Sequence, residues 1–143
     1  MTTLQPVLIP ADLVKDRLGQ PLLTSIPAGW PSPAENYVED SLDLHRMVVR
    51  NPAATFFLRV MGDSMVGAGI HNNDLLVVDR SLTHTAGKVV VAIVNGELTV
   101  KRLVKRKGKM LLCPENPDYS EIDLASQEEA SIWGVVTYVL HQP

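Results

Sequence analysis

The sequence predicts an all-β domain, a compact barrel-like or sandwich arrangement of short strands, with an extended, proline-rich arm at its N-terminal side. From residue 55 onward, β-branched and apolar runs of five to nine residues alternate with turns rich in glycine, asparagine and proline. No helical pattern long enough to cross a sheet separates these runs, so parallel β-α-β winding is not expected. A chain of 143 residues fits one such domain.

The arm is predicted from the distribution of proline. Six of the ten prolines lie in the first 34 residues. Each proline removes a backbone donor and disfavours helix in the residue before it, so we expect extended chain with one helical turn over residues 11–18. The stretch DLHRMVVRNP then predicts a short helix, with Asp43 as its N-cap and Pro52 just beyond its end.

The expected strands follow one another from residue 55 to residue 140. Their sequences are TFFLRV, DLLVVD, KVVVAIV, ELTVKRLV, KMLLC and IWGVVTYVL. The pair Asn95-Gly96 between two apolar runs is typical of a two-residue hairpin turn. The basic run KRLVKRKGK contains Gly108 and also lies between two expected strands, so we interpret it as a solvated hairpin rather than a nucleic-acid patch.

Composition excludes several classes of protein. The net charge is -3, which gives no overall field that attracts nucleic acid. A single cysteine, Cys113, cannot form an internal disulfide and suits a reducing compartment. The sequence contains no apolar run of 18 residues and no signal-peptide pattern, so no membrane span and a cytoplasmic location are expected.

Ser64 stands in a glycine-rich loop between two expected strands, in LRVMGDSMVGAGIHNNDLLVVDR. Serine in such a loop is most often only a turn residue. The hydrolase elbow G-x-S-x-G is not matched, because Gly62 fits but position 66 is valine and a β-run follows. The histidines after Ser64 have no sequence context typical of a Ser-His-Asp triad. They are His71, His84 and His141.

Lysine can replace histidine as the base that activates a serine. Lys101 lies in the predicted strand ELTVKRLV, where it shares one face with Thr99 and Leu103. Arg102 shares the other face with two valines. Both faces are partly apolar, so the alternation does not decide whether Lys101 points into the core or toward solvent.

The sequence predicts neither a cofactor nor a metal site. The four histidines and Cys113 show no spacing typical of metal ligands. The sequence also contains no glycine-rich phosphate loop with its lysine.

Five short motifs follow one another along nearly the whole chain. They are AGWPSPAENYVE at 28–39, GDSM at 62–65, NNDLL at 72–76, LTVKRL at 98–103 and PENPDYSEI at 114–122. In this order and with this spacing they resemble the LexA-type serine peptidases, and most closely the UmuD-like self-cleaving subunits of translesion DNA polymerases. NNDLL stands where that family has DGDLL.

The resemblance implies a role for each matched residue. Ser64 would be the nucleophile and Lys101, 37 residues later, the general base. The scissile bond would join Ala28 to Gly29. The chain would then comprise a removed segment (1–28), an arm with a short helix (29–52) and a peptidase domain (53–143). We expect the backbone N–H groups of Ser64 and Asp63 to form the oxyanion hole.

The resemblance also implies partners: a homodimer, a RecA filament on single-stranded DNA that promotes cleavage, and a UmuC-type polymerase subunit that the shortened form joins in the SOS response. No sequence-specific DNA binding is expected. The alternatives are a LexA- or phage-repressor-like peptidase that cuts other proteins, and a non-catalytic dimeric binding module of the same fold. Intact Ser64 and Lys101 disfavour the binding module. The 28 residues before the expected bond are too few and too proline-rich for a helix-turn-helix domain, which disfavours a repressor.

Overall fold

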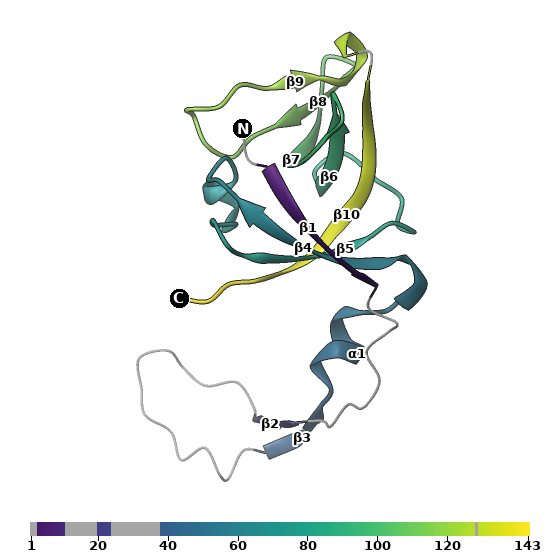
Figure 1. Cartoon of the computed structure of the whole chain (residues 1–143), viewed down its shortest axis with the longest axis vertical. Helices are drawn as coiled ribbons and strands as arrows, with labels where there is room; N and C mark the ends of the chain where they lie inside the picture. Colours follow the sequence, from purple (N-terminus) through teal and green to yellow (C-terminus); the bar gives the residue numbers. More distant parts are fainter. Residues whose placement is uncertain (1–2, 11–19, 24–37, 128) are drawn as a thin grey trace.

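Short strands make up most of the described chain, as the alternating apolar runs predict (Figure 1). The structure is a computed structural model, and it describes residues 3–10, 20–23, 38–127 and 129–143. The strands are β1 (Thr3–Pro10), β2 (Gln20–Leu23), β3 (Val38–Leu42), β4 (Thr55–Met61), β5 (Leu75–Asp79), β6 (Val89–Val94), β7 (Glu97–Arg106), β8 (Lys109–Cys113), β9 (Ile122–Asp123) and β10 (Ala130–Leu140). The helices are α1 (Leu44–Val48) and three single turns of 3-10 helix, η3 (Pro52–Ala54), η4 (Val66–Ala68) and η5 (Leu124–Ser126).

One antiparallel sheet curls back on itself. Its strand order is β1-β4-β5-β10-β6-β7-β8-β9. β1 pairs along β4 and also meets β7, because Thr3 lies opposite both Met61 and Thr99. The six strands from β1 to β7 in this order therefore form a closed ring, and β8 and β9 extend it. The predicted all-β, barrel-like class is confirmed.

Strand β10 joins the two halves of this ring. Its first half pairs with β6 and its second half with β5, with Val135 in register with both Val90 and Asp79. Figure 1 shows β10 as one long arrow that runs from the β8–β9 end of the molecule to the β5 end. A single strand therefore sets the position of β6–β7 relative to β4–β5, which matters because the candidate site takes residues from both.

The predicted hairpins are confirmed. Asn95 and Gly96, between β6 and β7, have φ angles of 52° and 81°, and Lys107 and Gly108, between β7 and β8, have 51° and 76°. Positive φ at both central residues is the conformation that fits the twist of a tight hairpin. The basic run therefore belongs to a hairpin, and its residues from 105 to 109 are exposed.

The short helix before the main strands follows its sequence signals, whereas the strands β2 and β3 were not predicted. Helix α1 begins after Asp43, whose carboxylate accepts a hydrogen bond from the Arg46 N–H at 3.1 Å, as predicted for an N-cap. The helix ends at Val48, and Pro52 starts η3. β2 and β3 pair with each other, and Figure 1 shows them with α1 below the main sheet. The helical turn expected over residues 11–18 lies outside the described residues.

Buried apolar side chains lie on both faces of β6 and β7. Val91 and Val100 belong to one core cluster, which includes side chains of β4 and β5, whereas Val90 and Leu103 belong to a second. Neighbouring residues fall into different clusters because side chains alternate across a strand. The middle of β7 is thus buried on both faces, and an ionisable side chain there is removed from water whichever way it points. Within the described ranges, no helix is long and apolar enough to span a membrane.

The β6–β7 turn provides a test of the fold. Gly96 has φ of 81° and open space where a side chain would begin, so Gly96→Ala adds only backbone strain. We expect this change to lower the free energy of unfolding by about 1 to 2 kcal/mol. Asn95→Gly, at the neighbouring positive φ, is the matched control and should cost little. Urea denaturation followed by circular dichroism measures both, and an equal stability of Gly96→Ala and the unchanged protein would contradict the assigned turn.

Candidate active site

Ser64 lies in the loop from β4 to β5, close to the point where the chain leaves β4. Gly62 has φ of 101°, a conformation that residues with a Cβ atom rarely adopt. Its N–H donates to Asn72 Oδ1 at 2.8 Å, which joins the beginning of the loop to its end. Met65 and Ile70 are buried in the core, so the loop is anchored on both sides of η4. Ser64 is itself buried.

The side chain of Lys101 reaches Ser64 from β7. Lys101 Nζ lies 3.1 Å from Ser64 Oγ, and the lysine side chain is only 1% exposed. Two further oxygens surround the amine, Thr99 Oγ1 at 3.0 Å and the Val100 carbonyl at 3.1 Å. Burial lowers the pKa of Lys101 from 10.5 to about 8, because desolvation disfavours the charged form. About one tenth of the protein therefore carries a neutral lysine at pH 7.

The neutral Lys101 amine can form one hydrogen bond with each of its three partners. It has two N–H donors and one lone pair. The two donors can serve Thr99 Oγ1 and the Val100 carbonyl, which leaves the lone pair for the Ser64 hydroxyl proton. This arrangement has the geometry needed for lysine to remove a proton from serine.

A second loop, residues 114–120, supports the nucleophile loop through its backbone. The Glu115 N–H donates to the Ser64 carbonyl, and the Gly67 N–H donates to the Glu115 carbonyl, both at 2.8 Å. A Cβ atom on Gly67 would lie 2.7 Å from that same carbonyl oxygen, so glycine is what lets the two loops approach. Asn116 Nδ2 donates to the Asp63 carbonyl at 3.0 Å, on the N-terminal side of Ser64.

The side chains of this second loop are tied to its neighbours as well. The Tyr119 hydroxyl donates to Asp63 Oδ1 at 2.5 Å. That hydrogen bond, with a smaller contribution from desolvation, raises the pKa of Tyr119, so the phenol keeps its proton and remains a donor. Arg102 Nε donates to Glu115 Oε1 at 2.6 Å, which joins the loop to β7, the strand that carries Lys101.

The structure places some of the site residues predicted from the sequence close together, whereas others lie outside the described residues. Ser64, Asp63 and Lys101 meet in one place, whereas Ala28 and Gly29 lie outside the described residues. Sequence reasoning did not identify Thr99 as a partner of Lys101, although the two-residue spacing placed both on one face of the strand. It also gave no role to Glu115, Asn116 or Tyr119, although the PENPDYSEI motif contains all three.

Other side chains that could act as base or nucleophile are placed differently. His71 and His141 contact the carboxylate of Asp74. Cys113 is buried, and burial together with the nearby Glu121 raises the pKa of its thiol, so a reactive thiolate is disfavoured. Ser64 with Lys101 is the nucleophile–base pair that the described geometry supports.

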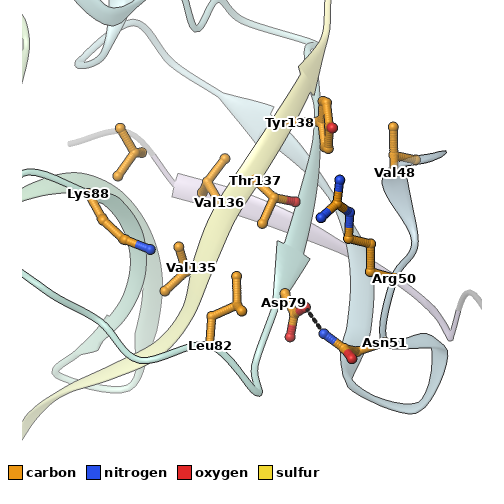
Figure 2. A pocket seen from close by; sticks show the side chains of 11 residues that line it. Val48, Arg50, Asn51, Asp79, Leu82, Lys88, Val135, Val136, Thr137 and Tyr138 are labelled. Atoms are coloured by element: carbon orange, nitrogen blue, oxygen red, sulfur yellow. Dashed lines mark hydrogen bonds between the residues drawn. The ribbon is translucent and has the colours of Figure 1, made fainter.

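A large cavity lies elsewhere. It has a volume of about 540 Å³ and is lined by the segment after α1, by β5 and by β10, without Ser64 or Lys101. Figure 2 shows Asn51 on one side of it, joined to Asp79 by a hydrogen bond of 2.8 Å. Val135, Thr137 and the rest of this stretch of β10 form the opposite wall. The candidate chemistry is therefore not placed in this cavity.

One group of potential metal ligands forms in the described structure. His71, Asp74 and His141 each offer one ligand atom, and these atoms lie within 4.8 Å of one another. The spacing of the four histidines and Cys113 in the sequence predicts no metal site, and His141 lies 67 residues after Asp74 in the chain. Only folding brings the three together.

Comparison with known proteins identifies the family of this chain and several relatives. The chain matches the family described as Peptidase S24-like over residues 21–137. It is 47% identical to Protein SamA of Salmonella typhimurium over 123 residues, which cover 85% of each chain. It is 49% identical to Protein MucA of Escherichia coli over 119 residues, 82% of this chain and 81% of MucA. It is 42% identical to the LexA repressor of Frankia alni over 122 residues, 85% of this chain and 47% of the repressor.

The lowered pKa of Lys101 predicts a dependence of stability on pH. Between pH 8 and 10.5 the unfolded chain holds a proton on this lysine that the folded chain does not. The free energy of unfolding should therefore rise with pH across this window, by as much as ~3 kcal/mol. Below pH 8 the folded protein carries the full cost of burying the protonated amine. Lys101→Met, which fills similar space without a charge, should remove that rise and be more stable at pH 7.

Urea denaturation at several values between pH 7 and 10.5 measures this effect. Both proteins should carry Ser64→Ala, so that no reaction of the hydroxyl interferes. Other titrating groups contribute equally to the two, so the difference between them isolates Lys101. Parallel pH profiles would show that Lys101 keeps an ordinary pKa in the folded protein.

Proposed function

Because the chain belongs to the Peptidase S24-like family, we propose that it is a self-cleaving serine endopeptidase whose shortened form supports an error-prone translesion DNA polymerase in the SOS response to DNA damage. The observation that carries this proposal is the buried contact of 3.1 Å between Ser64 Oγ and Lys101 Nζ. The likeness to SamA and MucA over more than 80% of the chain supports the same role.

In the proposed reaction, neutral Lys101 takes the hydroxyl proton as Ser64 Oγ attacks the carbonyl carbon of Ala28. The tetrahedral intermediate collapses when the bond to the Gly29 nitrogen breaks, and Lys101 delivers its proton to that leaving amine. The remaining ester between Ala28 and Ser64 is then hydrolysed by water, with Lys101 again as the base. Lysine thus acts as base and acid in turn, as histidine does in other serine peptidases.

The N–H groups of Ser64 and Asp63 are the proposed donors to the oxyanion. In a trans peptide the carbonyl and the N–H point in opposite directions. Asn116 holds the Asp63 carbonyl on the side of the second loop, and this hydrogen bond fixes the opposite direction of the Ser64 N–H. Donors that are oriented before the reaction stabilise the developing charge without reorganisation.

The proposed substrate is the arm of the same protein. Cleavage after Ala28 would remove residues 1–28 and leave an arm with a short helix, residues 29–52, on a peptidase domain of residues 53–143. Attack within one molecule gains from a high effective concentration. An extended segment of the arm, β1, already pairs beside Met61 and Thr99. This segment thus pairs with the sheet next to the dyad in an extended conformation, which is the conformation in which a peptide is presented for cleavage.

The proposed setting is the cytoplasm, where the protein acts as a homodimer. A RecA filament on single-stranded DNA would promote cleavage, and the shortened form would join a UmuC-type polymerase subunit. A second candidate is a peptidase that cuts other proteins, which the likeness to the LexA repressor favours. Incubating the shortened protein with the full-length Ser64→Ala chain shows whether the peptidase can act between molecules, which this second candidate requires.

The first test of the proposal is the position of the cut. Incubation of the full chain with RecA, ATP and single-stranded DNA should give fragments of 28 and 115 residues, identified by intact-mass spectrometry. Ser64→Ala, which keeps the loop but lacks the nucleophile, should give none. A cut at another bond, or fragments from the Ser64→Ala chain, would sink the assignment.

The second test is the pH dependence of uninduced cleavage. With a lysine pKa of about 8, the rate should rise about tenfold from pH 6 to 7 and level off above about pH 9, because only the neutral amine acts as base. A histidine base would reach its plateau near pH 7.5. Lys101→Arg should abolish cleavage at every pH, since arginine does not deprotonate in this range. Time courses with circular dichroism at each pH measure this, and cleavage by Lys101→Arg would exclude lysine as the base.

A further inference from the structure

We propose that His71, Asp74 and His141 bind a divalent transition-metal ion of the Zn²⁺ class. The three residues come from the end of the nucleophile loop and from the residues that follow β10. A bound ion would fasten these two parts of the chain to each other. Neither Ser64 nor Lys101 takes part, so this site is distinct from the proposed dyad.

The distances suit a small ion with nitrogen and oxygen ligands. Two atoms bound to Zn²⁺ at tetrahedral angles lie about 3.3 Å apart. His71 Nδ1 and Asp74 Oδ2 are 3.6 Å apart, close to that separation. His141 Nδ1 and Asp74 Oδ1 are 2.6 Å apart and share a hydrogen bond. Metal binding would replace the proton of this bond, and the two atoms would move apart by less than about 1 Å.

The carboxylate is held in place by the fold. Asp74 is only 3% exposed, and its carbonyl accepts a hydrogen bond from the Val60 N–H at 2.8 Å. Its N–H donates to the His71 carbonyl at 3.1 Å, and its Oδ2 accepts from the His71 N–H at 2.7 Å. The two imidazoles, by contrast, are 48% and 44% exposed, so they can adjust and an ion can enter between them. Their rings already lie 4.6 Å apart, centroid to centroid.

The ligand set selects the class of ion. Two imidazoles with one carboxylate suit Zn²⁺, Co²⁺ or Ni²⁺, whereas Ca²⁺ and Mg²⁺ prefer oxygen ligands alone. A cavity of about 420 Å³ is lined by Asp74, Asn72 and Gln142 among others. Arg59 also lines this cavity and adds a positive charge. Because this positive charge repels a cation, electrostatic attraction alone would not hold the ion. Coordination by the imidazole nitrogens would supply the affinity.

The position of the site gives it a mechanical role. Asn72, between the two ligands of the loop, accepts the hydrogen bond from the Gly62 N–H that closes the base of the nucleophile loop. An ion bound to His71 and Asp74 would restrain the same base, and through His141 it would hold the C-terminal residues against it. Binding to the folded state alone would also raise the thermal stability of the protein.

The test uses the untagged, metal-free full-length chain titrated with Zn²⁺ in a calorimeter. We expect one ion per chain. His71→Gln and His141→Gln should each weaken the affinity at least about tenfold, because each removes a ligand. His84→Gln is the matched control, since His84 is an exposed histidine outside the cluster, and it should leave the affinity unchanged. Mg²⁺ and Ca²⁺ in excess should not displace Zn²⁺.

Two further readouts keep the proposal open to refutation if a variant folds poorly. Co²⁺ bound to the unchanged protein should give the strong visible absorption of a low-coordinate nitrogen–oxygen site. Zn²⁺ should raise the melting temperature of the unchanged protein and of His84→Gln, but not of His141→Gln. The proposal is wrong if the unchanged chain shows no saturable Zn²⁺ binding, or if His84→Gln weakens binding as much as the cluster variants do.

Discussion

The removal of the Lys101 amine from water is the constraint on which the candidate site depends. An exposed lysine stays protonated at neutral pH and cannot accept a proton from serine. The structure buries this lysine in the middle of β7, where apolar clusters lie on both faces of the sheet. The same burial that lowers the pKa of Lys101 destabilises the folded protein whenever the lysine amine is protonated. The packing of the rest of the sheet thus offsets the cost of burying this one lysine beside Ser64.

Ser64 has to be held in a fixed position beside this amine, and the loops around it provide that restraint. The nucleophile loop is closed at its base by the Gly62–Asn72 hydrogen bond and anchored through Met65 and Ile70. The second loop holds it from the side through backbone hydrogen bonds of Glu115. Because Arg102 connects the second loop to β7, the nucleophile and the base are positioned by one connected set of contacts.

The N-terminal strand gives the proposed cleavage a structural consequence. β1 closes the ring of strands between β4 and β7, and its Thr3 lies opposite Thr99, the partner of Lys101. In the proposed reaction this strand belongs to the removed segment, so cleavage would detach a strand of the main sheet and leave the edge of β4 unpaired. An unpaired edge can accept a strand from another chain. Self-cleavage would then change the surface that the protein presents to its partners.

The sequence alone predicted the strands β4 to β8 and β10 and suggested Ser64 with Lys101 as the reactive pair, because both predictions rest on local signals. Short β-branched and apolar runs, the Asn95-Gly96 turn and the Asp43 cap act over a few residues, and the order of the motifs matched Ser64 and Lys101 to one family pattern. What the sequence could not decide was the environment of Lys101, since alternation left both faces of its strand partly apolar. The curled sheet settled this by burying both faces. The cluster of His71, Asp74 and His141 was likewise decided by tertiary structure, because β10 must pair along β5 before its last residues reach the loop. Burial and long-range contact depend on how strands are arranged in space, and no short stretch of sequence encodes that arrangement.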